Sequence, residues 1–127
     1  MYIATRISGD VAVFDIAGDF TRKDSPIPTL HELAHGQLET GMRKILFNFE
    51  KVGFVDSFGM GQIVSSYIST RNLGGGFKLC QVPPKLLFFL KVVNLVPNVI
   101  SVYPDETAAL ESFANPSPPG DPTNLKP

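Results

Sequence analysis

A disulfide framework, a basic surface and a long apolar segment are all missing from this sequence. Its single cysteine, Cys80, has no second cysteine to pair with and lies in an apolar run typical of a strand, which favours a reducing compartment. The formal net charge is -1, so no positive excess is available to bind a nucleic-acid backbone. The most apolar run, 86–96, contains Lys91 and Asn94 and is far shorter than the roughly 20 residues of a membrane helix. The N-terminal MYIATRISGD lacks the apolar stretch of a signal peptide, and we therefore expect a soluble, cytoplasmic protein.

Hydrophobic periodicity and turn residues predict strands that alternate with helices after an initial hairpin. Strands are expected over 2–7, 11–17, 44–49, 77–82 and 99–103, with Ser8-Gly9-Asp10 as the hairpin turn. Helices are expected near 30–38, from the Asp-Ser pair to about Asn72, from Pro83-Pro84 onward, and after a capping Asp105. The order ββαβαβαβα indicates an α/β fold with a mixed, largely parallel sheet, an N-terminal antiparallel hairpin and four helices.

The composition changes abruptly near the end of the chain. Residues 1–114 supply the apolar positions of one core, which suits a single domain for a chain of 127 residues. Residues 115–127 read NPSPPGDPTNLKP, with five prolines and almost no apolar side chains. Such a segment cannot bury enough surface to offset the entropy of ordering it, so we predict a disordered Pro-rich tail.

An Asp-Ser pair, Asp56-Ser57, stands between a predicted strand and an amphipathic helix. Either side chain could cap that helix, and an ordinary cap explains the pair by itself. Gly59 and Gly61 follow and would let another backbone or a phosphate approach closely. A phosphate on Ser57 would be favoured at the positive end of the helix dipole and would add about -1.5 to -2 charges beside Asp56. The pair is therefore a candidate regulatory site.

A second motif, His31-Glu32-Leu33-Ala34-His35, matches the HExxH signature of zinc proteases. Histidines four residues apart on a helix share a face and can bind one zinc ion, with the glutamate as general base. The extended motif, however, needs Gly at 38 and His at 41, where this chain has Leu38 and Gly41. The helical pattern also places Glu32 toward solvent, so we expect a solvated helix face with no metal.

The third predicted helix is almost entirely apolar. On a helical wheel its buried stripe contains Leu86, Phe89, Leu90 and Val93, whereas Phe88 points outward and Leu87 lies at the side. An outward apolar pair could form a second contact surface, and we expect weak homo-oligomerisation through Leu87 and Phe88. A single exposed apolar residue is also common on protein surfaces and needs no function.

The stretch 45–110 resembles the STAS family, which includes the anti-sigma factor antagonists. It reads ILFNFEKVGFVDSFGMGQIVSSYISTRNLGGGFKLCQVPPKLLFFLKVVNLVPNVISVYPDETAAL. Its elements follow one another in the family's order. These are a strand, an Asp-Ser turn, a helix, a Gly-Gly break, a second strand, a helix with a late Leu, a third strand, and an acidic helix start with an Ala-Leu pair. Gly18-Asp19 and Asn48, both before the Asp-Ser turn, also match, so the resemblance covers roughly residues 1–114 and implies a STAS-like fold.

The resemblance implies a phosphorylation switch that regulates transcription. Antagonists of this family bind an anti-sigma factor that is itself a GHKL-type serine kinase, and this binding frees the sigma factor. The kinase phosphorylates the serine after the Asp and releases the antagonist, and a PP2C-type phosphatase reverses the step. Ser57 matches that serine, and Phe58 stands where many members have a second Ser or Thr. The residues assigned to partner binding are Asp19, Phe20, Thr21, Asp56, Ser57, Phe58, Gly59, Met60, Gly61 and Gln62.

This interpretation predicts a binding module with no catalytic activity and no cofactor. Two alternatives remain beside it. One is a small zinc hydrolase built on His31 and His35. The other is a STAS-like scaffold or lipid-transport subunit that is never phosphorylated.

Overall fold

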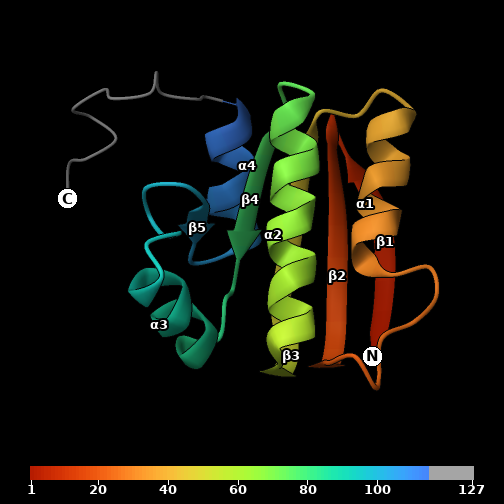
Figure 1. Ribbon diagram of the computed structural model, residues 1–127. Helices are drawn as coiled ribbons and strands as arrows, with labels where there is room; N and C mark the ends of the chain where they lie inside the picture. The colour runs from red at the N-terminus through yellow and green to blue at the C-terminus, as the bar shows by residue number, and fades with distance from the viewer. Residues whose placement is uncertain (115–127) are drawn as a thin grey trace.

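A computed structural model of the protein describes residues 1–114, arranged as an α/β fold (Figure 1). The strands are β1 (Tyr2–Ser8), β2 (Val11–Phe20), β3 (Lys44–Val55), β4 (Gly76–Cys80) and β5 (Ser101–Tyr103). The helices are α1 (Leu30–Glu39), α2 (Ser57–Asn72), α3 (Pro84–Val92) and α4 (Glu106–Ala114). The predicted order ββαβαβαβα is confirmed. The tail predicted over 115–127 lies outside the described residues.

The strands form one sheet in the order β1-β2-β3-β4-β5. β1 pairs antiparallel with β2 in a register that sets Tyr2 opposite Ala17 and Ser8 opposite Val11. The neighbours β2–β3, β3–β4 and β4–β5 are all parallel. The predicted mixed, largely parallel sheet with a hairpin at one edge is therefore confirmed.

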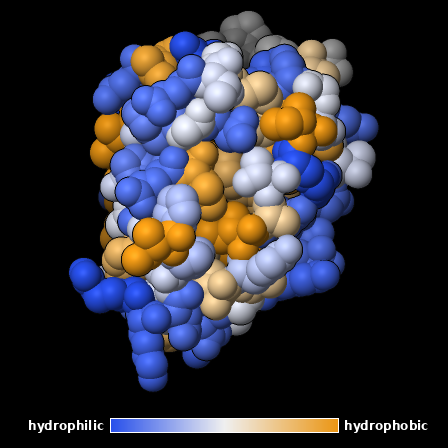
Figure 2. All heavy atoms as spheres, turned by 90° about the vertical axis from the view of Figure 1, so that its right-hand side faces the viewer, coloured by the Kyte–Doolittle hydropathy of each residue, from blue (hydrophilic) through white to orange (hydrophobic). Residues whose placement is uncertain are grey.

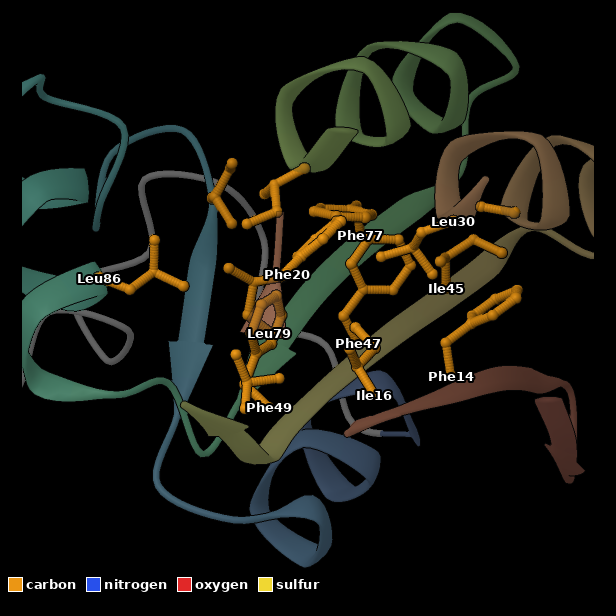
Figure 3. Close-up of a cluster of buried hydrophobic side chains, with 14 of the residues drawn as sticks. Phe14, Ile16, Phe20, Leu30, Ile45, Phe47, Phe49, Phe77, Leu79 and Leu86 are labelled. Carbon is orange, nitrogen blue, oxygen red and sulfur yellow. The ribbon is translucent and has the colours of Figure 1, made fainter. Parts of the chain in front are cut away.

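Helices cover both faces of the sheet, and each face has its own buried cluster. α1 and α2 pack on one face, where the ring of Phe47 lies 5.5 Å from that of Phe14 and 4.9 Å from that of Phe77, centroid to centroid (Figure 3). α4 covers the other face with Ala109 and Phe113. Because successive residues of a strand point to opposite faces, the adjacent residues of β3 serve the two clusters in turn.

Local signals start the helices at the predicted places. Thr29 and Glu32 form a reciprocal capping box at the start of α1, in which the Thr29 hydroxyl accepts from the Glu32 amide and the Glu32 carboxylate accepts from the Thr29 amide. Asp105 accepts a 2.8 Å hydrogen bond from the Ala108 amide at the start of α4, as predicted. None of the helices within residues 1–114 combines the length and hydrophobicity needed to cross a bilayer.

Figure 2 shows the side of the molecule that carries α1 and the β1 edge. Apolar side chains gather in the middle of this face, within a largely hydrophilic surround. Partly buried residues such as Ile3 on β1 and Leu33 on α1 pack against the core. The core is therefore closed from this side by residues that are themselves only half covered.

The second and third strands run further than the sequence pattern predicted. β2 was expected to end at Ala17 and β3 at Phe49, but they continue to Phe20 and Val55. The parallel ladder passes through two register shifts and ends with Phe20 opposite Val55. Pairing with a neighbouring strand extends both segments beyond their apolar runs, which a local pattern cannot show. The extension brings the end of β2 beside the Asp-Ser pair.

The predicted face of α3 was wrong at two positions. Leu86 and Leu90 are buried as expected, and Phe88 is 69% exposed as expected. Phe89 and Val93, predicted to be buried, are 46% and 42% exposed. The helix lies at one end of the fold and packs through one narrow side, which includes the partly buried Leu87. It is therefore rotated toward Leu87 relative to the predicted wheel.

Candidate functional site

The site is built at the junction where β3 ends and α2 begins. Asp56 lies between them in an extended conformation, with φ -96° and ψ -174°, and caps the helix. Its Oδ1 accepts a 2.9 Å hydrogen bond from the Gly59 amide. Its own amide donates to the Phe20 carbonyl at 3.2 Å. The cap is thereby tied both to the helix and to the end of β2, which fixes where the next residue, Ser57, is presented.

The second carboxylate oxygen of Asp56 is also occupied. The Arg22 amide donates a 3.1 Å hydrogen bond to Oδ2 of Asp56. The hydrogen bond from the Gly59 amide, followed by that from Arg22, lowers the pKa of Asp56, because both favour the ionised carboxylate. The cap therefore carries a full negative charge at neutral pH. A charge on the neighbouring residue would add to it.

Ser57 is the first residue of α2, and its side chain is exposed. Asp56 makes the capping hydrogen bond to the first turn, so the Ser57 hydroxyl is not needed to start the helix. Of the two capping residues that the sequence allowed, the structure uses the aspartate. The serine is left facing solvent at the positive end of the helix dipole, where a phosphate group is electrostatically favoured.

Gly59 is a close-approach position, as a glycine in this turn suggested. A Cβ built on it would lie 2.4 Å from the Phe20 carbonyl oxygen and 2.7 Å from Cγ1 of Val55. The backbone of α2 can therefore approach β2 and β3 only with glycine here. Gly61 differs, because a Cβ on it would meet no atom within 4 Å. Gly61 is exposed and leaves open space on the outer side of the first turn.

The structure corrects two of the predicted partner contacts. Phe20 is fully buried in the main core cluster, and Gly59 is buried against it. The Phe20 side chain cannot reach another protein, and Gly59, which has no side chain, is buried where α2 packs against β2 and β3. Gln62 is half-buried, and its Oε1 accepts a 2.9 Å hydrogen bond from the His31 amide. Its amide group thus joins α2 to the start of α1.

The other predicted contact residues lie at the surface of this junction. Asp19 is exposed, and its Oδ1 lies 3.0 Å from the position that a Cβ on Gly53 would occupy. Thr21 is half-buried and exchanges hydrogen bonds with Asp24 in the loop that follows β2. Met60 is half-buried and packs against the core. The ends of β2 and β3 and the first turn of α2 therefore form one continuous surface.

Phe58 carries a cation on its ring. The Arg22 guanidinium carbon lies 5.2 Å from the centroid of the Phe58 ring, which is half-buried. The same Arg22 binds Asp56 through its backbone, so the residue contacts both neighbours of Ser57. Sequence reasoning did not single out Arg22, because no local pattern joins a loop residue to a helix start 34 positions away.

An apolar groove of about 260 Å³ opens beside Ser57. It lies between the end of β3, the start of α2 and the start of α3, all in the lower part of Figure 1. Phe54 and Phe89, which are 58% and 46% exposed, supply its aromatic surface, and Lys85 supplies a cation. The groove residues that sequence reasoning did not place at the site are Gly53, Phe54, Val55, Pro83, Lys85, Leu86 and Phe89. The helical spacing of Phe89 predicted a buried side chain, so it gave no sign of this exposure.

The HExxH residues have structural roles on α1. The rings of His31 and His35 are 6.4 Å apart, and Nε2 of His31 lies 2.9 Å from the Ser69 hydroxyl on α2. Burial, followed by the charge of His35, lowers the pKa of His31. Glu32 is exposed and engaged in the capping box. Within residues 1–114, no cluster of three or more His, Cys, Asp or Glu side chains could hold a metal ion.

Several solved structures are similar to this chain in their fold. TM1081 of Thermotoga maritima, a candidate anti-sigma factor antagonist, shares 23% identity over 88% of this chain and 94% of its own, with a TM-score of 0.74. An anti-sigma factor antagonist from Mycobacterium paratuberculosis shares 17% identity over 89% and 93%, with a TM-score of 0.75. The Bacillus cell fate determinant SpoIIAA in its phosphorylated form shares 17% over 88% and 99%, with a TM-score of 0.65. These similarities show a common fold.

The family assignment comes from the sequence itself. The model of the STAS domain matches residues 2–109, which include all five strands and the junction that carries Asp56 and Ser57. The match and the shared fold agree with the resemblance found in the series of turns, strands and helices. The chain belongs to the STAS domain family.

Proposed function

We propose that this protein is an anti-sigma factor antagonist whose binding is switched by phosphorylation of Ser57. One observation at the start of α2 carries the proposal. Asp56 caps the helix, and Ser57 is left exposed. A kinase can therefore reach the Ser57 hydroxyl without unfolding the first turn. A structural neighbour, SpoIIAA, exists in unphosphorylated and phosphorylated forms, which supports the same use of this fold.

The partner-binding surface combines the exposed first turn of α2 with the apolar groove. An apolar side chain of the partner would enter the groove that Phe54 and Phe89 line, and the exposed Ser57 lines the same groove. Water is displaced from both aromatic rings on binding, and this burial supplies the affinity. A phosphate on Ser57 would bring about -1.5 to -2 charges to the edge of that contact, and desolvating it would cost binding energy. Phosphorylation thus weakens the complex without altering the fold.

The partner that fits this mechanism is an anti-sigma factor that is also a GHKL-type serine kinase, with a PP2C-type phosphatase restoring the binding form. The chain itself acts by binding and needs no catalytic group or cofactor. The formal net charge of -1 argues against a nucleic-acid partner. Phe58 follows Ser57 directly, so the turn offers the kinase one hydroxyl rather than two.

The test compares affinity for the cognate anti-sigma factor across charge variants. Ser57→Ala should bind like the wild type and resist release by the kinase, and Ser57→Asp should bind more weakly. Thr107→Asp is the matched control, because Thr107 is an exposed residue in the first turn of a different helix, α4. It should leave the affinity unchanged. Equal affinities for Ser57→Ala and Ser57→Asp, or a kinase that leaves Ser57 unmodified in mass spectrometry, would contradict the switch and favour a scaffold role.

A further inference from the structure

Arg22 is a cation that contacts both neighbours of Ser57. Its amide is bound to the Asp56 carboxylate at 3.1 Å, and its guanidinium lies over the Phe58 ring. The backbone bond fixes the start of the side chain beside the helix cap. The rest of the side chain is exposed and can turn about its own bonds. Arg22 can therefore change partners without any movement of the main chain.

The guanidinium is held on Phe58 by a weak interaction. Ion pairs between side chains within residues 1–114 use other cations, namely Arg6, His35 and Lys44. The charge of Arg22 helps to lower the pKa of Asp56, so it lies within electrostatic reach of the cap. An exposed cation on an aromatic face is held less firmly than a guanidinium that shares two hydrogen bonds with a phosphate. A phosphate placed next to Phe58 would therefore compete successfully for this side chain.

We propose that Arg22 is the residue that recognises phosphoserine at position 57. Its guanidinium would move off the Phe58 ring and bind the phosphate oxygens. This inference rests on the proposed function of Ser57 and adds a defined partner for the modified side chain. The planar guanidinium suits a phosphate in its fork geometry and stays charged at any physiological pH. The exchange would uncover the outer face of Phe58 and remove a positive charge from it. Phosphorylation would thus change the surface at two adjacent residues.

Lys85 is the competing cation, because it lines the same groove as Ser57. It stands on α3, across the groove, and none of the hydrogen bonds found within residues 1–114 joins it to Asp56. Arg22 is bound directly to the residue that precedes Ser57. This fixed backbone connection beside Ser57 favours Arg22. The two assignments predict different variants to be sensitive, so one experiment separates them.

The experiment uses the full chain with phosphoserine incorporated biosynthetically at position 57, so it requires neither the kinase nor the partner. The phosphate pKa is measured by ³¹P NMR titration at low ionic strength, where exposed charge pairs are least screened. An adjacent guanidinium favours the dianion, so Arg22→Gln should raise this pKa by roughly 0.2 to 0.7. Lys23→Gln is the matched control, because Lys23 is the next residue, is exposed and carries the same charge. It should give a smaller change.

A second measurement follows the Arg22 side chain itself. In the unphosphorylated chain, the Arg22 Hδ protons should show an upfield ring-current shift that Phe58→Leu removes. Phosphoserine at position 57 should remove the same shift while Phe58 is still present. A phosphate pKa that is unchanged by Arg22→Gln, or one that rises in Lys85→Gln instead, would overturn the assignment. Retention of the ring-current shift in the phosphorylated chain would do the same, and none of these outcomes would bear on whether a kinase acts on Ser57.

Discussion

The amide of Arg22 donates a hydrogen bond to Asp56 across 34 positions of sequence, and this contact ties the loop after β2 to the cap of α2. The other oxygen of the same carboxylate binds the Gly59 amide. One aspartate therefore fixes the helix start, the loop and the presentation of the serine between them.

The cap at Asp56 should make stability depend on acid. The folded protein lowers the pKa of Asp56, so the cap contributes stability above the unfolded value of about 3.9 and loses it as pH falls through the lower folded value. Asp56→Ala should lower the melting temperature at neutral pH. Asp56→Asn, which keeps a capping oxygen, should lower it less and should remove this residue's share of the acid dependence. Thermal unfolding followed by circular dichroism through the acid range measures both effects, and identical curves for the Asn variant and the wild type would count against the ionised cap.

The two glycines of the first turn should respond in opposite directions to the same substitution. Gly59→Ala forces a Cβ against the Phe20 carbonyl and should destabilise the fold by about 1 to 3 kcal/mol. Gly61→Ala enters open space on a helix and should stabilise by about 0.4 to 1 kcal/mol. Denaturant unfolding gives both free energies. A Gly59→Ala variant as stable as the wild type would show that α2 can move away from β2.

Adjacent positions of α3 should separate stability from surface contacts. Leu90→Ala removes a fully buried side chain and should cost about 2 to 5 kcal/mol. Phe88→Glu should leave the circular dichroism spectrum unchanged, because the Phe88 side chain is mostly exposed. If the chain self-associates through Leu87 and Phe88, the same variant should abolish that association in sedimentation velocity.

Phe89→Glu should also fold, since Phe89 is half exposed, but should weaken partner binding through the groove.

His31 should make the protein less stable in mild acid. Burial and the charge of His35 lower the pKa of His31, so the neutral ring is favoured in the folded state. The corresponding stability is complete above the unfolded pKa of about 6.5 and is lost as pH falls through the lower folded value. His31→Gln should flatten the stability profile in this range. His35→Gln, on the exposed side of the same helix, is the control and should keep most of the slope.

The HExxH pair should bind no stoichiometric zinc. Glu32 is engaged with the Thr29 backbone, and His31 is directed at Ser69, so neither is arranged around a common metal position. Elemental analysis of the purified protein should find much less than one zinc per chain. One zinc per chain that disappears in a His31→Ala/His35→Ala double variant would revive the hydrolase hypothesis.

Local sequence signals account for most of the architecture. Turn residues such as Ser8-Gly9-Asp10, the capping residues Thr29 and Asp105, and the Gly74-Gly75 break mark where elements begin or end, because each acts on the backbone within a few residues. The same local chemistry predicted a cap at Asp56-Ser57. It left open which of the two residues makes the cap.

Contacts between distant segments decided the rest. Pairing carried β2 on to Phe20 and β3 on to Val55, and packing at one end of the fold turned Phe89 toward solvent. The sequence by itself determined the order of the elements and the family, because both depend on hydrophobic periodicity and on turn and capping residues, which act over a few residues each. Tertiary structure alone decided that Ser57 lies beside an apolar groove and that Arg22 contacts both Asp56 and Phe58. These contacts depend on residues that meet only after the sheet has formed, so no periodicity within one segment can encode them.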